Sequence, residues 1–283
     1  MGQGHGWEGA VLKLLRGKDF VFTVTGAEQV TEHYRRIHLT DGGMLGVTGV
    51  HPTMWVRLWF DAAGKPHQRA YTLVDPDPAA GAFSLEFALH DGHASDWARA
   101  ARPGDTIEAT VHGTAFTDPD PAPSHILAMG DPAYLPAINS LLTALPSAPA
   151  TIWFETSAAP EAEDETEGKT TGKTTRGTAS DTGGDTGGAT GGATGGDTGG
   201  ETGGLPLRLD PARHDFRPVP RENAGARLLS QVKTDVPALL ADTPDPYVWI
   251  ACDTATTRSL TAYFRKELGL PKQRMHALGY WRP

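Results

Sequence analysis

The stretch Phe83-Ser-Leu-Glu-Phe-Ala-Leu-His-Asp-Gly-His-Ala-Ser-Asp-Trp97 joins a strand pattern directly to a helix pattern. Large apolar residues occupy alternate positions over 83–89, which is the period of a strand with one buried face. A turn at Gly92 follows, and Ser95 is placed to cap a short helix. Free backbone N–H groups at a helix N-terminus bind anions well. The stretch therefore predicts a phosphate site near Ala94 and Ser95.

The sequence around this stretch has further strand patterns separated by turn signals. The clearest strand candidates are 20–24, 54–60 and 106–111. Turn sequences such as Asp41-Gly-Gly43 and Arg102-Pro-Gly-Asp105 separate them. Many short strands with regular turns are typical of an antiparallel β-barrel. We therefore expect a β-barrel domain over residues 15–120.

The pattern changes after the proline-rich stretch 118–123, because strands now alternate with helices. The predicted strands lie at 126–129, 151–154, 205–209, 247–251 and 275–278, and the predicted helices at 136–145, 224–240 and 257–268. This alternation is typical of a parallel sheet covered by helices. We expect this α/β domain to span residues 123–283.

A polar segment at about 158–204 interrupts the second domain. It begins with an acidic run and ends in tandem tetrapeptides from Asp181-Thr-Gly-Gly to Glu201-Thr-Gly-Gly204. Such a composition has no apolar surface to bury, and ordering its glycines costs much entropy. The sequence predicts a disordered insert between two strands.

Composition and charge narrow the function classes. Acidic residues outnumber basic ones, 34 to 25, over 283 residues, and the formal net charge is −9. Because nucleic-acid binding needs a clustered basic surface, no nucleic-acid partner is expected. Cys252 is the single cysteine, which fits a reducing compartment. No apolar leader or membrane-spanning run is evident, so a cytoplasmic protein without an integral membrane segment is expected.

The run Arg69-Ala70-Tyr71-Thr72 combines a guanidinium, a flat ring and a hydroxyl. In a strand Arg69 and Tyr71 share one face, and this set suits a flavin nucleotide: charge for the phosphates, a ring for stacking and a hydroxyl near N5. Taken alone, the run favours an ordinary barrel strand with an exposed arginine. The phosphate site predicted after it favours the flavin interpretation.

Two sharper alternatives are not supported by the sequence. The spacing His90-x-x-His93 suggests a metal site, but no third ligand has a defined relation to it. Cys252 ends an apolar strand with no histidine near it in sequence, so it is expected to be inert packing rather than a nucleophile. We therefore predict no metal site and no catalytic side chain.

Five blocks together resemble the siderophore-interacting protein family, which is related to ferredoxin reductases. The blocks are Arg69-Ala-Tyr-Thr72, His90 with Gly92–Trp97 and 101–105, Gly130-Asp-Pro-Ala-Tyr-Leu-Pro-Ala-Ile138, Tyr247-Val-Trp-Ile-Ala-Cys-Asp253 and Gly279-Tyr-Trp-Arg282. The resemblance implies an FAD-binding β-barrel followed by an NAD(P)H-type α/β domain. Together the motifs and the resemblance predict these FAD contacts: Arg69, Ala70, Tyr71, Thr72, His90, Gly92, His93, Ala94, Ser95, Trp97, Asp131 and Trp281.

The resemblance also implies an activity. NAD(P)H or reduced ferredoxin would supply electrons to FAD, and FAD would reduce the Fe(III) of a ferric siderophore. Fe(II) is held more weakly by the oxygen donors of a siderophore, so iron is released. Arg57 and Arg282 are the candidates for attracting an anionic ferric complex.

The chain departs from the family pattern at four places. Val74 and His93 replace a common arginine and a proline, Pro132-Ala133 replaces Glu-Thr, and Cys252-Asp253 replaces Gly-Glu. The last two changes fall where the electron donor is expected. Two alternatives therefore stay open: a general NAD(P)H–flavin reductase, and a flavin-binding protein whose nucleotide site is impaired.

Overall fold

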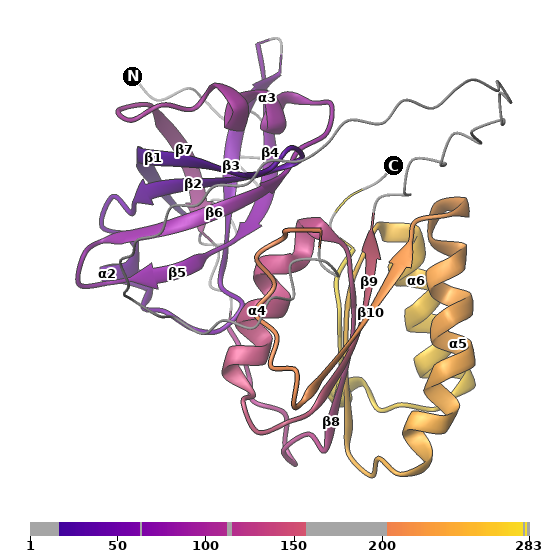
Figure 1. Ribbon diagram of the computed structural model, residues 1–283. Helices are drawn as coiled ribbons and strands as arrows, with labels where there is room; N and C mark the ends of the chain where they lie inside the picture. The colour runs from indigo at the N-terminus through magenta and orange to yellow at the C-terminus, as the bar shows by residue number, and fades with distance from the viewer. Residues whose placement is uncertain (1–16, 63, 112–114, 157–202, 280, 282–283) are drawn as a thin grey trace, which may run out of the picture.

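The computed structural model describes residues 17–62, 64–111, 115–156, 203–279 and 281. Two sheets follow one another along the chain, with the antiparallel sheet above the parallel one in Figure 1. The predicted insert lies outside the described residues except for Gly203 and Gly204, and Arg282 also lies outside them. The exact limits predicted for the two domains stay a prediction.

The first sheet has seven strands in the order β4-β3-β7-β1-β2-β6-β5, and all its pairings are antiparallel. Its elements are β1 (Lys18–Thr31), β2 (Tyr34–Thr40), α2 (Met44–Thr48), β3 (Trp55–Ala62), β4 (Lys65–Thr72), β5 (Val74–Asp77), β6 (Ala82–Ala88), α3 (His93–Ala100) and β7 (Thr106–Val111). The alternating residues Phe83, Leu85 and Phe87 are buried in its core, as the strand pattern predicts. The antiparallel, barrel-type first half is therefore confirmed.

The second sheet has five parallel strands in the order β10-β9-β8-β11-β12. Its elements are β8 (His125–Gly130), α4 (Leu135–Ala144), β9 (Ala150–Thr156), β10 (His214–Pro220), α5 (Ala226–Ala241), β11 (Pro246–Ala251), α6 (Thr254–Ala262) and β12 (Met275–Ala277). The strand order reverses between β8 and β11, which defines a topological switch point at their carboxyl ends. The predicted parallel α/β half is confirmed.

Helices cover both faces of the parallel sheet, with α4 on one side and α5 and α6 on the other (Figure 1). Successive strand residues therefore enter different cores. Ile126 and Ala128 pack with residues of α4, whereas Leu127 and Met129 pack with residues of α5 and α6. A continuous apolar run is what a strand buried on both faces requires. No described helix combines the length and the hydropathy that crossing a bilayer demands.

The strand predicted at 205–209 is wrong. This segment has no regular structure, and it is fixed by Asn139 of α4, whose side chain bonds the Pro206 carbonyl at 2.8 Å and the Arg208 amide at 2.7 Å. The strand in this part of the chain is β10, which contains Pro218 and Pro220. Proline is tolerated there because β10 is the edge strand.

The predicted starts of two helices also need correction. Helix α3 begins at His93 with Gly92 as its N-cap, so Ser95 lies inside the helix and does not cap it. Helix α6 begins at Thr254, earlier than predicted, because the Asp253 carboxylate accepts hydrogen bonds from the amides of its first turn. A π-helical turn, Tyr263–Glu267, continues α6.

Polar and apolar contacts join the two halves. The Thr53 amide donates to Ser140 Oγ at 2.8 Å, and Arg208 forms a two-pronged ion pair with Asp75. Tyr34 of β2 packs within the core beside α4. These contacts place β5, which follows the Arg69–Thr72 motif directly, against the second half.

Candidate functional site

The predicted flavin motif forms the end of β4. Arg69 is exposed, and its Nη1 donates to the Gln68 carbonyl at 2.9 Å. Among the described residues no carboxylate pairs with it. Tyr71 is half-buried against the core and Thr72 is buried, while Ala70 pairs with Arg57 of β3. The strand therefore presents a free cation beside a ring that is already held in place.

An aromatic cluster connects β4 to α3. The ring centroid of Tyr71 lies 4.4 Å from that of Phe87 and 6.3 Å from that of Phe60. Trp97 of α3 lies 5.7 Å from Phe87 and 5.9 Å from Phe60. Burial raises the pKa of Tyr71, so its hydroxyl stays neutral. The structure thus brings the two predicted flavin segments, 69–72 and 90–97, into one cluster.

The N-terminus of α3 has no side-chain cap. Its N-cap Gly92 has a φ of 139°, a conformation that favours glycine, and no side chain accepts from the first N–H groups. The Ser95 hydroxyl is used elsewhere, since it accepts from the His90 amide at 3.1 Å. The amides of His93 and Ala94 therefore remain available to a ligand. Free amides, the Arg69 guanidinium and the aromatic cluster fit the phosphate and ring of a flavin nucleotide.

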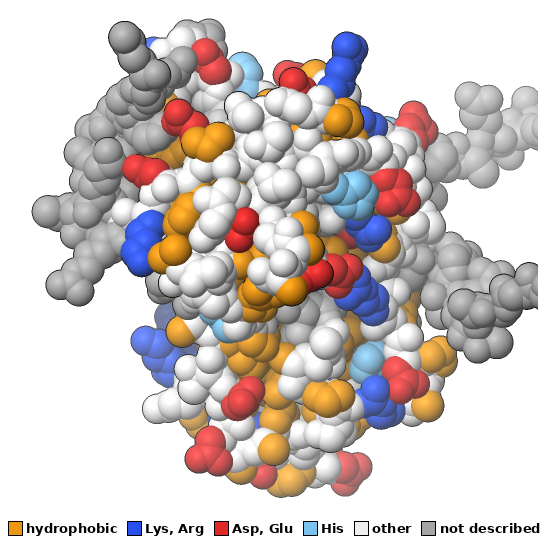
Figure 2. Space-filling model, turned by 90° about the vertical axis from the view of Figure 1, so that its left-hand side faces the viewer, with side chains coloured by type: hydrophobic (Ala, Val, Ile, Leu, Met, Phe, Trp, Pro, Cys, Tyr) orange, Lys and Arg blue, Asp and Glu red, His pale blue; other side chains and the backbone are white. Residues whose placement is uncertain are grey.

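The candidate siderophore contacts are less defined. Arg57 lies on β3 with its guanidinium 5.0 Å from the centroid of the Trp55 ring. Figure 2 shows that Lys and Arg side chains on the face turned to the viewer stand apart from one another, often beside acidic ones. This face carries no basic patch of the kind expected around an anionic complex. Arg57 stays a prediction, and Arg282 is outside the described residues.

A second group of polar side chains lies at the carboxyl edge of the parallel sheet. Asp131 directly follows β8, and its Oδ1 accepts from the Ala133 amide at 2.9 Å. Its Oδ2 accepts from Trp281 Nε1 at 2.9 Å. Burial raises the pKa of Asp131 to about 7. The Trp281 carbonyl accepts from both the amide and the hydroxyl of Thr254 at 2.9 Å. Asp131 and Trp281 are thus fixed together across the switch point.

Arg221, one residue past β10, joins two further carboxylates of this edge. Its Nη1 donates to Glu155 Oε2 and its Nη2 to Asp253 Oδ2 at 3.1 Å, while its guanidinium lies 4.8 Å from the centroid of the Trp281 ring. The Glu155 and Asp253 side chains are each 1% exposed. Burial raises the pKa of Glu155, whereas hydrogen bonds from Thr256 and Arg221 outweigh burial and lower that of Asp253. We name Asp131, Glu155, Arg221, Asp253 and Trp281 the carboxyl-edge cluster.

Three residues that differ from the family pattern, Cys252, Pro132 and Ala133, lie near the carboxyl ends of β11 and β8. Cys252 is fully buried in the core with Met129 and Ile250, and the carboxyl groups of Asp131, Glu155 and Asp253 lie close enough to act on its thiol. Burial raises the pKa of its thiol well above the usual value. Pro132 and Ala133 form a single 3₁₀ turn that leads into α4.

Sequence reasoning missed Glu155 and Arg221. The sequence does contain a signal for Glu155, because this residue directly follows the apolar run 151–154. The carboxyl ends of parallel strands meet at one edge, so a polar residue just after such a run is expected there. Arg221 follows a strand rich in proline and charge, which gives no such signal. In the described part of the chain, no group of three or more His, Cys, Asp or Glu side chains is arranged to hold a metal ion.

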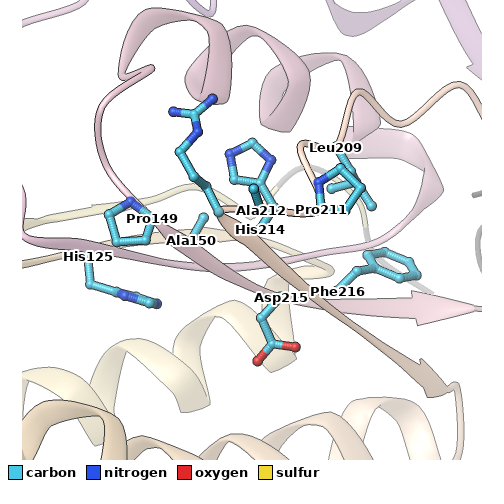
Figure 3. A pocket seen from close by; sticks show the side chains of 10 residues that line it. His125, Pro149, Ala150, Leu209, Pro211, Ala212, His214, Asp215 and Phe216 are labelled. Atoms are coloured by element: carbon cyan, nitrogen blue, oxygen red, sulfur yellow. The ribbon is translucent and has the colours of Figure 1, made fainter. Parts of the chain in front are cut away.

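A hollow of about 580 Å³ lies at the opposite edge of the parallel sheet. His125, Ala150 and His214, the first residues of β8, β9 and β10, are among its lining residues (Figure 3). Its charged groups are already engaged, since Arg213 pairs with Asp210. Open α/β sheets bind ligands at their carboxyl ends. The hollow is therefore not assigned to the redox site.

The fold is of the ferredoxin reductase type, with an antiparallel first half and a parallel second half. A ferredoxin–NADP⁺ reductase of Neisseria gonorrhoeae with bound FAD and NADP is similar over 93% of this chain and 99% of its own, at a TM-score of 0.56 and 13% identity. The siderophore-interacting protein of Acinetobacter baumannii is similar over 94% of this chain and 91% of its own, at a TM-score of 0.67 and 17% identity.

Two family models that describe siderophore-interacting proteins match separate parts of the chain. The siderophore-interacting FAD-binding domain matches residues 53–113, and the siderophore-interacting protein model matches residues 206–283. The mycobactin import ATP-binding/permease protein IrtA of Mycolicibacterium thermoresistibile is 36% identical over 151 residues, which are half of this chain and 17% of IrtA. The predicted resemblance is confirmed, and the FAD-binding match covers β4 and α3.

Proposed function

We propose that this protein binds FAD and reduces ferric siderophores, releasing Fe(II). The observation that carries the proposal is the match of siderophore-interacting models in both halves, over 53–113 and 206–283. The likeness to part of a mycobactin importer supports a siderophore as the substrate class. The physical basis of release is that reduced iron is bound more weakly by hard oxygen donors.

The chain's own groups would hold the cofactor in the first half. The Arg69 guanidinium and the free amides of α3 would bind the phosphates, and the ring of Tyr71 would pack on the flavin. Thr72 would offer its hydroxyl near the reactive edge. Bound FAD supplies the ability to take up two electrons and pass them on singly, which suits one-electron reduction of iron. No side chain is proposed as a proton donor.

The electron donor in this proposal is NAD(P)H or reduced ferredoxin. A nicotinamide nucleotide would bind at the switch point between β8 and β11, beside the carboxyl-edge cluster. Such donors would act in the cytoplasm, the compartment that the single cysteine also favours.

The test measures reduction and then reoxidation of the bound flavin. The purified protein is reconstituted with FAD and reduced anaerobically by NADH, NADPH or reduced ferredoxin. A ferric siderophore is then added, and flavin reoxidation and chelator-trapped Fe(II) are recorded. The gallium(III) complex of the same siderophore is the control, since it has the same charge but cannot be reduced.

The expected result is reoxidation by the ferric complex and none by the gallium complex. A protein that cannot be reconstituted with FAD would contradict the proposal in all its forms. A flavin that is reduced by a nicotinamide but not reoxidised by ferric siderophores would support the general reductase. Failure of both nicotinamides alongside success of ferredoxin would identify ferredoxin as the donor.

A further inference from the structure

Glu155 has a carboxylate oxygen that lacks a hydrogen-bond donor. Its Oε2 accepts from Arg221, whereas its Oε1 is buried and has no partner among the described residues. Buried carboxylate oxygens are normally bonded, because leaving one unsatisfied costs free energy. Within the described ranges, no three metal-ligating side chains are grouped around Glu155. Oε1 can therefore accept a hydrogen bond from an N–H or O–H donor that the described residues do not supply.

The position of Glu155 in the fold indicates which kind of hydrogen-bond donor its Oε1 would accept from. It lies at the carboxyl end of β9, the second strand of the unit β8–α4–β9. In dinucleotide-binding α/β sheets, an acidic side chain in this region accepts from the ribose 2′-hydroxyl of NAD, whereas NADP requires an arginine for its 2′-phosphate. A ribose hydroxyl is the donor that Oε1 lacks.

The charges around Glu155 oppose a 2′-phosphate. Arg221 is the cation of the carboxyl-edge cluster, and both of its terminal nitrogens are taken by Glu155 and Asp253. Asp131 adds a third carboxyl group. The next arginine along the chain, Arg227, is paired with Glu222. A 2′-phosphate would bring two more negative charges beside carboxylates that are poorly screened because they are buried.

We propose that Glu155 accepts a hydrogen bond from the ribose of the donor nucleotide and makes this protein select NADH over NADPH. This inference rests on the proposed function, in which a nicotinamide nucleotide reduces the flavin. Glu155 acts on the choice of donor and takes no part in electron transfer itself.

The first experiment measures the rate of anaerobic flavin reduction against nucleotide concentration in the FAD-loaded protein. NADH is expected to be favoured over NADPH by at least about tenfold, the effect of losing one charge-assisted hydrogen bond. Glu155→Gln keeps the side-chain shape but removes the charge, and it should narrow that ratio by about tenfold. Glu86→Gln is the matched control: Glu86 is also buried and paired with an arginine, Arg36, and its loss should leave the ratio unchanged.

A binding measurement decides the inference even if Glu155→Gln fails to fold. ADP-ribose and its 2′-phosphorylated form are titrated into the wild-type, FAD-loaded protein by calorimetry. ADP-ribose should bind at least about tenfold more tightly. Equal or tighter binding of the phosphorylated probe, or no binding of either, would overturn the inference. Failure of the proposed function is seen separately, as flavin that NADH reduces but ferric siderophores do not reoxidise.

Discussion

The candidate flavin site on β4 and α3 differs from the carboxyl-edge cluster in how its charged groups are paired. In the first, Arg69 has no carboxylate partner among the described residues and the N-terminus of α3 has no side-chain cap. In the second, Arg221 is bonded to two buried carboxylates and Asp131 is bonded to Trp281. The polar groups of the first region are left for a ligand, whereas most of those in the second region bond one another and hold its strands together. Substitutions should therefore reduce binding in the first region and stability in the second.

The largest effect is expected from Arg221→Ala. Removing the guanidinium leaves Glu155 and Asp253 buried without their shared cation, which should lower the free energy of unfolding by about 3–5 kcal/mol. Urea denaturation measures this loss. Arg227→Ala is the control, because Arg227 and Glu222 form an exposed pair worth less than about 1 kcal/mol. Equal losses in the two variants would show that the cluster does not stabilise the fold.

A slightly smaller effect is expected from pH through Asp131, whose pKa is raised from 3.8 to about 7 by burial. The folded state then keeps a proton that the unfolded state releases, so stability falls as pH rises from about 4 to about 7. The expected loss is about 3 kcal/mol.

Asp131→Asn cannot titrate and should lack this fall. Urea denaturation of both proteins across this pH range isolates the contribution of Asp131, because the other titrating groups are common to both. Parallel stability curves for the two proteins would contradict the raised pKa.

The two regions also differ in how far the sequence predicts them. The flavin site is local: Arg69–Thr72 and His90–Trp97 each form one continuous segment, so strand period and turn signals locate both. The structure adds the aromatic contact that joins them. The carboxyl-edge cluster combines residues from positions 131 to 281, and only the strand order brings them together. Asp131 and Trp281 were found through family resemblance, and Glu155 and Arg221 were not found.

The errors in the predicted elements have physical causes. Strand β10 was missed because Pro218 and Pro220 are typical of turns, and only its place at the sheet edge permits them. The apolar segment 205–209 resembles a strand, but it packs its leucines without a partner strand while Asn139 bonds its backbone. Ser95 resembles an N-cap, yet the positive φ of Gly92 starts α3 earlier.

In the candidate flavin site, Arg69→Ala should weaken FAD binding without destabilising the fold. Loss of one charge-assisted contact to a phosphate is expected to cost about 2 kcal/mol, or about 30-fold in the dissociation constant. Calorimetric titration of the apoprotein with FAD measures it. Arg102→Ala removes an exposed arginine of the same half and should leave FAD affinity unchanged. If Arg69→Ala instead lowers the unfolding free energy and leaves FAD affinity intact, the contrast between the two regions fails.

The smallest effect is expected from Gly92→Ala. A Cβ on Gly92 meets only the His90 ring, at 3.8 Å, so there is space for it, but the φ of 139° is one that alanine rarely adopts. Strain alone should therefore lower the unfolding free energy of the apoprotein by about 1 kcal/mol. Gly46→Ala is the control, because Gly46 lies within α2 where an added Cβ meets no atom within 4 Å, and alanine favours a helix. A Gly92→Ala protein as stable as wild type would mean that the uncapped start of α3 is not held in this conformation, and the free amides assigned to the phosphate would lose their basis.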